Sequence, residues 1–375
     1  MNTNLLVVLA GCLLPALGPA AAAEAPALSD HVISDDNYPE RKVAFPGGVT
    51  GLSDLTYETL SGYRPMKLDL YLPPASFAGP RPFVIYIHGG GWANGIPRTA
   101  AVFANWPHVL ASFAARGYVT ASVSYRFQNE APFPAAIQDV KAAIRWLHSN
   151  AESYNIDTTR GMTWGSSAGG QLAALAAVSC GVAALDPPVT AAGAGPANAN
   201  VEKNTAGPLD AAASNCVQGA VGWYGVYDFE TLGKGVAPGS PPLHLPSRYL
   251  DCGSEPCTAE KLRFASPVAY VDEKAPPILL IQGTDDHTVS PAQSPEFYEA
   301  LRAKGAKVEL MMLPGIDHSY IGATPEATRE AALTGWLRRS SSSTPRSATR
   351  GSVAANYGLM ARGSIPETGV SRLTR

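Results

Sequence analysis

Strand-like and helix-like patterns alternate along the chain between about Lys67 and Arg338. Every second position from Met66 to Leu72 is apolar, which predicts a half-buried strand. A continuous apolar run, Phe83–Ile87, ends at His88-Gly89 and predicts a central strand that is buried on both faces. Because strands that alternate with helices form parallel sheets, the pattern predicts an α/β fold with a mainly parallel central sheet flanked by helices on both faces.

Further elements follow the same alternation. Apolar residues recur at three- and four-residue intervals between Pro134 and Asn150, which predicts an amphipathic helix, and an alanine-rich helix is predicted from Ser167 to Val178. The other predicted elements are strands at Tyr118–Val123, Gly161–Trp164, Val217–Tyr224, Ile278–Gln282 and Lys307–Leu313, and helices at Pro291–Ala303 and Pro325–Leu337.

Two stretches break this alternation. The segment Gly181–Asn215 is rich in Ala, Gly, Pro and Asn and has hardly any large apolar residue, so it predicts a flexible insertion. From Arg338 onward the chain has seven Arg against one Glu and the serine run Ser340–Ser343, which predicts a disordered tail. We therefore expect one folded domain over residues 24–338, with the insertion at 181–215 and the tail over 339–375.

Composition and charge exclude several classes of protein. The chain has 375 residues and is 46% hydrophobic, which suits one large α/β domain with a sizeable core. Its 28 Lys and Arg against 31 Asp and Glu give a net charge of −3, and the part before the basic tail is more acidic still. A nucleic-acid binder would carry a basic surplus on its folded part, so we expect no nucleic-acid partner. Beyond the N-terminus no apolar stretch reaches about 20 residues, so no membrane span is expected.

The N-terminus has the pattern of an export signal. A short apolar run, Leu5–Leu14, is followed by small residues that end at Ala20–Ala23, which predicts a signal peptide over residues 1–23 and a secreted or periplasmic protein. The first five residues contain no Lys or Arg, which departs from the usual signal. The run Leu9-Ala10-Gly11-Cys12 also resembles a lipoprotein cleavage box, and we rank a lipid anchor at Cys12 second.

Four cysteines remain after removal of the leader, and an even number in an exported chain is compatible with two disulfides. Cys252 and Cys257 enclose a short turn-rich link, and Cys180 and Cys216 flank the predicted insertion. Four reduced thiols are the alternative. Their spacing matches neither a zinc site nor a thioredoxin motif.

The sequence G-x-S-x-G occurs at Gly165–Gly169 and is centred on Ser167. A predicted strand precedes it and a predicted helix follows it, which is the context of a nucleophile elbow. In that context the turn would push the Ser167 hydroxyl out of the sheet, at the positive end of the helix dipole.

The run His88-Gly89-Gly90-Gly91 is about forty times rarer by chance than G-x-S-x-G. Three glycines after a buried strand indicate that something approaches the backbone closely. We expect the amides of Gly90, Gly91 and Ala168 to bind the oxyanion of an acyl transfer. The run lacks the Lys-Ser/Thr of a P-loop and the glycine spacing of a dinucleotide site, so we discount a phosphate-binding loop. Acyl transfer through a serine needs neither a cofactor nor a metal, and we expect neither.

A serine nucleophile needs a base and an orienting acid. In chains with a nucleophile elbow these residues follow the serine in the order acid, then histidine. Among the histidines after Ser167, His318 lies in a loop after a late predicted strand and is the candidate base. Asp286, just past the strand Ile278–Gln282, is the candidate acid. Asp228 also follows a strand, and capping of the next helix is the interpretation that we favour for it.

Two neighbours of the candidate acid have simpler interpretations. Asp285 is interpreted as a turn residue. His287 lies beside acids, but no matching ligand cluster accompanies it, so we interpret it as an exposed loop residue and expect no metal.

With these residues placed, the chain resembles the α/β-hydrolase superfamily, in particular the HGGG carboxylesterases and the related feruloyl and acetylxylan esterases (BD-FAE-like). The resemblance runs from about Val49 to Leu337, and its matching stretches are Met66–Pro73, His88–Trp92, Arg116–Tyr118, Ser124–Arg126, Gly165–Gly170 and Gly283–Val289. It implies that Asp286 is the acid, His318 the base, and Gly90 and Gly91 the oxyanion glycines.

Two positions depart from the family pattern. The segment Gly181–Asn215 is longer than the usual link, which leaves the lid undefined. Ser166 stands before the nucleophile, where Glu or Asp is frequent.

Together these features predict an exported serine esterase with the triad Ser167, Asp286 and His318, acting on a small-molecule or polysaccharide-linked ester. A formamidase or amidase would use much the same residues, and a catalytically inactive hydrolase fold used for binding is the alternative from another class. Trp92 and Trp223 are candidate pocket walls, although both could equally be core residues.

Overall fold

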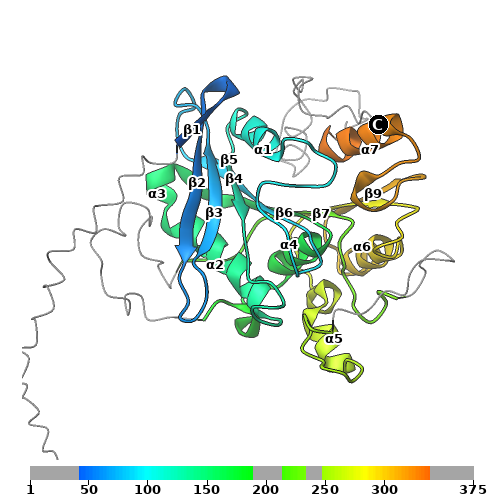
Figure 1. Ribbon diagram of the computed structural model, residues 1–375. Helices are drawn as coiled ribbons and strands as arrows, with labels where there is room; N and C mark the ends of the chain where they lie inside the picture. The colour runs from blue at the N-terminus through cyan, green and yellow to red at the C-terminus, as the bar shows by residue number, and fades with distance from the viewer. Residues whose placement is uncertain (1–41, 189–212, 234–246, 338–375) are drawn as a thin grey trace, which may run out of the picture. The chain divides into compact units, whose positions relative to one another are not determined.

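The computed structural model describes residues 42–188, 213–233 and 247–337. The predicted signal peptide, Cys12 and the predicted tail over 339–375 lie outside these residues. Within the described part, the chain forms a nine-stranded sheet in the order β1-β2-β3-β5-β4-β6-β7-β8-β9 (Figure 1). The strands are β1 (Lys42–Phe45), β2 (Val49–Glu58), β3 (Met66–Leu72), β4 (Arg81–Ile87), β5 (Val119–Val123), β6 (Ile156–Ser166), β7 (Ala220–Trp223), β8 (Ile278–Gly283) and β9 (Val308–Leu313).

The strands from β5 to β9 in this order run parallel, whereas β1, β2 and β3 pair antiparallel with their neighbours. The prediction of a mainly parallel central sheet is therefore confirmed. Strands β1 and β2 were not predicted from the sequence. In β2, buried and half-buried positions do not alternate regularly, because the register with β3 shifts twice along the strand.

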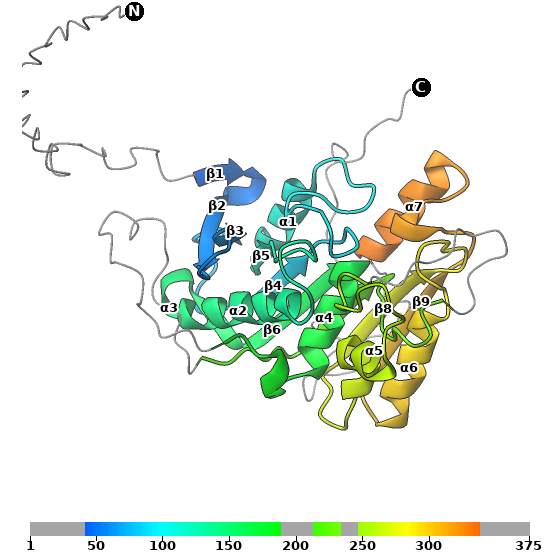
Figure 2. The ribbon, with the colours of Figure 1, turned by 60° about the horizontal axis from the view of Figure 1, so that its bottom comes forward.

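Helices cover both faces of the sheet (Figure 2). Helices α1 (Trp106–Ala114) and α7 (Pro325–Leu337) pack into one apolar cluster, in which the rings of Trp106 and Phe113 each contact Trp336. The cluster on the other face takes its side chains from α2 (Ala135–Ser149), α4 (Ala168–Val178) and α6 (Gln293–Ala303). Two short helices, α3 (Ala151–Tyr154) and α5 (Ala259–Ala265), complete the described set.

Parallel pairing brings the ends of four strands to one edge of the sheet. Ile87 at the end of β4 pairs with Gly165 of β6, and Ser166 pairs with Trp223 at the end of β7. Trp223 in turn pairs with Ile281 of β8. The loops that follow these strands therefore meet at the carboxyl edge, where ligand sites of open α/β sheets lie.

The described ends of the segment 181–215 are ordered. Leu185 is fully buried in the core, and a disulfide joins Cys180 to Cys216 across the base of the segment. This base lies just beyond the C-terminal end of α4, about 16 Å along the helix axis from Ser167. The base of the segment is therefore at the end of α4 that faces away from Ser167.

The connection between β7 and β8 lies at the carboxyl edge instead. Within it, the ring of Tyr249 stacks on Trp92 with ring centroids 4.4 Å apart, and the Tyr249 hydroxyl is 3.2 Å from Gln171 Oε1 at the start of α4. The same connection carries the second disulfide, Cys252–Cys257. This part of the chain therefore contacts the N-terminal half of α4 at Gln171, whereas the base of the segment 181–215 lies beyond its C-terminal end. Among the described residues, no helix combines the length and apolar character needed to cross a membrane.

Candidate active site

Ser167 lies in the sharp turn between β6 and α4. Its backbone has φ 54° and ψ −122°, a strained conformation for a residue with a side chain, and its amide donates to Trp223 O at 2.9 Å. A Cβ on Gly165 would lie 2.0 Å from Gly169 O, and a Cβ on Gly169 would lie 2.1 Å from Ile87 O. Both glycines of the motif are therefore required by close backbone contact, as in a nucleophile elbow.

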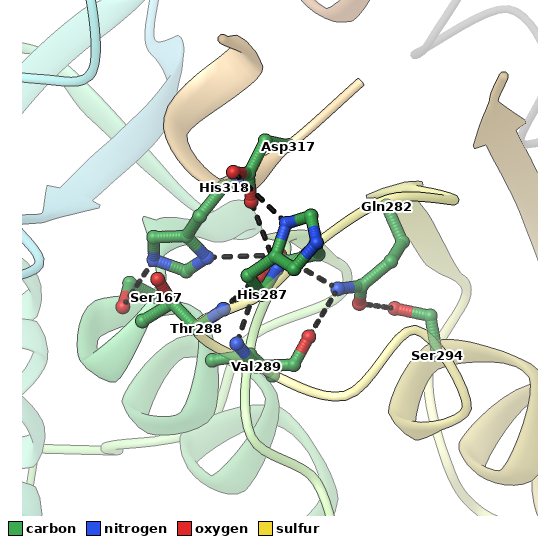
Figure 3. Close-up of polar contacts among 9 residues, drawn as sticks. Ser167, Gln282, His287, Thr288, Val289, Ser294, Asp317 and His318 are labelled. Atoms are coloured by element: carbon green, nitrogen blue, oxygen red, sulfur yellow. Dashed lines mark hydrogen bonds and ion pairs between the residues drawn. The ribbon is translucent and has the colours of Figure 1, made fainter. Parts of the chain in front are cut away.

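The side chains of Ser167, His318 and Asp286 form a continuous line of hydrogen bonds, of which Figure 3 shows the contact between Ser167 and His318. His318 Nε2 is 3.0 Å from Ser167 Oγ, and His318 Nδ1 is 2.9 Å from Asp286 Oδ2. Because a carboxylate can only accept, Nδ1 carries the imidazole proton and Nε2 is the acceptor for the Ser167 hydroxyl. The structure thus brings together the three residues of the predicted triad in the geometry that proton transfer from Ser167 requires.

The carboxylate of Asp286 is fully buried and accepts hydrogen bonds on both oxygens. Oδ1 accepts from the amides of Thr288 and Val289 at 2.9 and 2.8 Å, and Oδ2 accepts from Gln282 Nε2 at 3.0 Å as well as from His318. These donors leave the carboxylate one orientation, and the carboxylate in turn selects the tautomer and orientation of the imidazole.

Gln282 and Ser294 form a chain of hydrogen bonds that ends on Asp286, and neither residue was identified from the sequence. The Ser294 hydroxyl donates to Gln282 Oε1 at 2.7 Å, so that the Gln282 amide group points its N–H at Asp286 (Figure 3). The available signal was an amide side chain at the end of the otherwise apolar run Ile278–Ile281, because a buried glutamine requires hydrogen-bond partners.

The two other candidate acids lie outside this line of hydrogen bonds. Asp228 accepts from the amide of Glu230 at 2.8 Å, and Gln293 binds its backbone N–H and C=O. Asp228 therefore caps a turn rather than a helix. Asp285 accepts from the Thr284 hydroxyl at 2.7 Å, as expected of a turn residue.

The loop after β4 presents backbone amides next to Ser167. Gly90 and Gly91 have φ values of 116° and 60°, and a Cβ on Gly90 would lie 2.1 Å from Asn94 O. Within the described residues, the amide N–H groups of Gly90, Gly91 and Ala168 donate to no acceptor. Amide N–H groups without an acceptor at this position are suited to bind a developing oxyanion.

The His88 side chain is hydrogen-bonded to the backbone of this loop. Its ring stacks on Tyr125 with centroids 4.6 Å apart, and Nδ1 donates to Gly89 O at 2.7 Å. Burial lowers the pKa of His88 to about 4, against the opposing effect of the hydrogen bond to Gly89. The imidazole is therefore neutral at neutral pH, and its buried Nε2 has no partner in the described part of the chain.

A pocket of about 380 Å³ opens over Ser167. Its walls come from the glycine loop, from the 99–101 segment, and from Ser166, Tyr224, Thr288 and Ser319. Trp92 and Trp223 do not line it. Both are core residues at 5% and 1% exposure, and the Trp92 indole N–H donates to Gln171. Ser166, where the family often has an acid, lies 3.0 Å from the Tyr86 hydroxyl.

His287 is an exposed loop residue, as interpreted from the sequence, at 48% side-chain exposure. It nevertheless has a partner, because its Nδ1 lies 3.1 Å from Asp317 Oδ2. In the described ranges, no group of three or more His, Cys, Asp or Glu side chains is arranged to hold a metal ion.

The sheet, the elbow and the Ser-His-Asp line define a protein of the α/β-hydrolase class. A sequence profile of the BD-FAE family matches residues 68–301, more than half of the chain, and the chain belongs to this family.

Similar proteins carry esterase names. Esterase LipQ of Mycobacterium tuberculosis is 31% identical over 285 residues, which are 75% of this chain and 60% of LipQ. The chain thus spans little more than half the length of this curated relative. A solved structure described as a truncated form of carbohydrate esterase from gut microbiota is 27% identical, with a TM-score of 0.57 over 78% of this chain and 99% of that one. Esterase 2 of Thermogutta terrifontis, at 23% identity and a TM-score of 0.56 over 75% and 92% of the two chains, shares the fold.

Proposed function

We propose that this protein hydrolyses carboxylic esters through an acyl-enzyme intermediate. Ser167 is the nucleophile, His318 the general base and acid, and Asp286 the residue that orients the imidazole. The amides of Gly90, Gly91 and Ala168 form the oxyanion hole. The observation that carries the proposal is the line of hydrogen bonds from Asp286 through His318 to Ser167, next to bare amides in an open pocket.

The geometry supports each step of this mechanism. His318 Nε2 accepts the Ser167 proton while Oγ attacks the ester carbonyl, and the imidazolium that forms is stabilised by Asp286. The carbonyl oxygen becomes negative and is bound by the three amides. Nε2 then returns the proton to the departing alcohol. In the second half, His318 activates water, which attacks the acyl-enzyme and releases the acid and free Ser167.

The substrate that we propose has a short acyl group on a small-molecule or carbohydrate alcohol. The pocket walls at Ser166, Tyr224 and Ser319 are polar, and a volume of about 380 Å³ suits a small acyl group better than a long chain. LipQ is named an esterase, and the 27% identical structure is described as a carbohydrate esterase.

We also propose that the protein is exported, with residues 1–23 as the signal peptide and a catalytic domain over 24–338. The two disulfides, Cys180–Cys216 and Cys252–Cys257, support this location because disulfides persist in oxidising compartments.

Active-site labelling tests the proposed function. A fluorophosphonate should modify the purified protein once, with the added mass on the peptide that contains Ser167. Because Ser166 is the neighbouring serine, Ser166→Ala is the matched control and should still be labelled, whereas Ser167→Ala should not. A protein that is not labelled, or is labelled equally after Ser167→Ala, would contradict the proposal. A panel of acetyl, butyryl and feruloyl esters then measures the acyl preference, which should favour acetyl.

A further inference from the structure

The loops after β8 and β9 each carry an Asp-His dipeptide, and the two dipeptides pair crosswise. Asp286 of the first loop pairs with His318 of the second. His287 of the first loop pairs with Asp317 of the second (Figure 3). The inner pair is buried, with 0% exposure of the acid and 14% of the base. The outer pair is open to solvent at 48% for His287 and 38% for Asp317.

The carboxylate of Asp317 binds three donors. Oδ1 accepts from the amide of His287 at 2.8 Å and from the amide of His318 at 2.6 Å, whereas Oδ2 accepts from His287 Nδ1 at 3.1 Å. Burial alone would raise the pKa of Asp317, but the two amides and the imidazole outweigh it and hold the pKa below its ordinary value. The carboxylate is therefore ionised at neutral pH, and His287 Nδ1 carries the proton between them.

These contacts, together with the backbone hydrogen bond of 3.1 Å from the Asp285 amide to Ile316 O, set how far apart the two loops lie at the reacting groups. One oxygen of Asp317 binds both the amide next to the acid Asp286 and the amide of the base His318 itself. The base also sits where the backbone is strained, because Ser319 and Tyr320 follow it with φ values of 61° and 66°. Among the described strands β9 lies at the edge of the sheet, so the loop that carries His318 is supported by a strand from one side.

We propose that Asp317 and His287 are positioning residues of the active site, which hold His318 in line between Asp286 and Ser167. This inference rests on the proposed function. Asp317 supplies the side-chain tie that binds the amides next to Asp286 and of His318, and His287 keeps the Asp317 carboxylate turned toward both amides. Neither residue touches the substrate. Both act through the placement of the imidazole, and a displacement of about 1 Å there can lower the rate by about a hundredfold.

Another tie joins the same two loops farther from the base and provides the control. The Thr284 hydroxyl oxygen accepts from the amide of Gly315 at 2.9 Å. If any link between the loops were sufficient, loss of this one would slow the enzyme as much as loss of Asp317. The proposal predicts that it does not, because neither Thr284 nor Gly315 is adjacent to Asp286 or His318.

The experiment measures kcat and KM for p-nitrophenyl acetate with the purified full chain. Asp317→Ala should lower kcat by about 10- to 100-fold with KM changed by less than about threefold, because substrate binding is left intact. Thr284→Ala should keep kcat within about twofold of the parent. His287→Ala should lower kcat less than Asp317→Ala, and His287→Asn should restore much of the loss, because its amide N–H can replace Nδ1–H.

A spectroscopic readout separates positioning from general damage. The proton that His318 Nδ1 donates to Asp286 should give a low-field NMR resonance in the parent and in Thr284→Ala, and this resonance should broaden or vanish in Asp317→Ala. If Asp317→Ala does not fold, the comparison of His287→Ala with His287→Asn carries the test.

The inference is overturned if Asp317→Ala keeps the kcat of the parent, if Thr284→Ala loses as much as Asp317→Ala, or if His287→Asn is no better than His287→Ala. Failure of the proposed function is distinct, because then the parent itself would not be labelled at Ser167 by the fluorophosphonate.

Discussion

The two ends of helix α4 differ in whether the polar groups around them have hydrogen-bond partners. At the C-terminal end, the fully buried Lys141 ammonium donates to Ser179 O at 2.7 Å and pairs with Asp186 at 2.9 Å, and Asn215 also donates to Asp186. The Cys180–Cys216 disulfide closes the same region. At the N-terminal end, Ser167 is strained, and the amides of Ala168 and of the glycine loop are bare in the described residues.

This contrast indicates that the features which destabilise the folded state lie at the proposed catalytic end of the helix. Unpaired donors and strained backbone are unfavourable to the folded state, and they occur where a substrate oxyanion would satisfy them. Paired groups and a covalent link occur at the far end, where no chemistry is proposed. Variants at the N-terminal end should therefore change turnover more than stability, and variants at the C-terminal end should do the reverse.

The largest expected effect is on turnover at the N-terminal end. Ser167→Ala removes the nucleophile and should lower kcat for p-nitrophenyl acetate by at least about 10⁴-fold. The melting temperature should change little, since the hydroxyl contacts one imidazole and no buried packing partner is removed. Steady-state kinetics and a thermal melt measure both quantities. Retention of turnover in a variant shown by mass spectrometry to be pure would contradict the assignment.

The next effect concerns the acid. Asp286→Asn keeps the shape of the side chain but places an N–H₂ group where His318 needs an acceptor, so we expect kcat to fall by about 10²- to 10⁴-fold. Asp228→Asn should stay within a few-fold of the parent, because the amide oxygen can still cap the turn that begins at residue 228. Circular dichroism of both variants checks that they fold. Equal losses in the two variants would remove the distinction between the acids.

The sequence was informative where function depends on local spacing. G-x-S-x-G and His-Gly-Gly-Gly are adjacent residues whose backbone geometry is determined by the glycines themselves, so Ser167 and the loop at Gly90 could be placed without coordinates. Asp286 and His318 became candidates through their positions after predicted strands, because parallel strands bring those positions to one edge. The same rule also selects Asp228, so position alone did not separate the two acids.

Other features depend on contacts between distant residues and could not be predicted in this way. The side-chain amide of Gln282 is oriented by a hydrogen bond from Ser294. Asp317 links two loops because it binds His287, which lies 30 residues earlier in the chain. Trp92 and Trp223 were ambiguous because indole rings serve equally well in cores and in pockets.

The C-terminal end of α4 offers a stability test. Replacing both Cys180 and Cys216 with Ser releases a link across 36 residues and should lower the free energy of unfolding by about 4 kcal/mol in the chain-entropy model. Turnover at 25 °C should stay near that of the parent, because the disulfide is remote from Ser167. Urea titration and steady-state kinetics measure the two effects. A folded double variant with strongly reduced kcat would couple the two ends and break the comparison.

A pH effect on stability is expected at the catalytic end. The pKa of His88 is lowered by burial to about 4, from about 6.5 in an unfolded chain. Between these values the unfolded state binds more protons, so stability is full above about pH 6.5 and falls by up to about 3 kcal/mol as the pH drops to 4. His88→Gln should flatten this slope in urea titrations.

Glu58 also changes stability in this pH range, because its pKa is raised to about 7, first by burial and then by Asp139. Glu58 contributes with the opposite sign, because its stabilising protonated form is lost as the pH rises from about 4.5 through 7. Its contribution is the same in the parent and in His88→Gln, so it cancels in the difference between the two slopes. Parallel slopes in the two proteins would show that His88 is not the source.

The smallest effect concerns the strain at Ser167 itself. Glycine adopts positive φ readily, so Ser167→Gly should relieve about 1–3 kcal/mol of backbone strain that Ser167→Ala retains. The greater freedom of glycine in the unfolded chain offsets about 0.4–1 kcal/mol of this gain. We therefore expect the glycine variant to be more stable than the alanine variant by about 1 kcal/mol in urea titrations, although both lack the nucleophile. If the alanine variant were the more stable, the turn would hold no strain, and the contrast between the two ends of α4 would rest on unpaired donors alone.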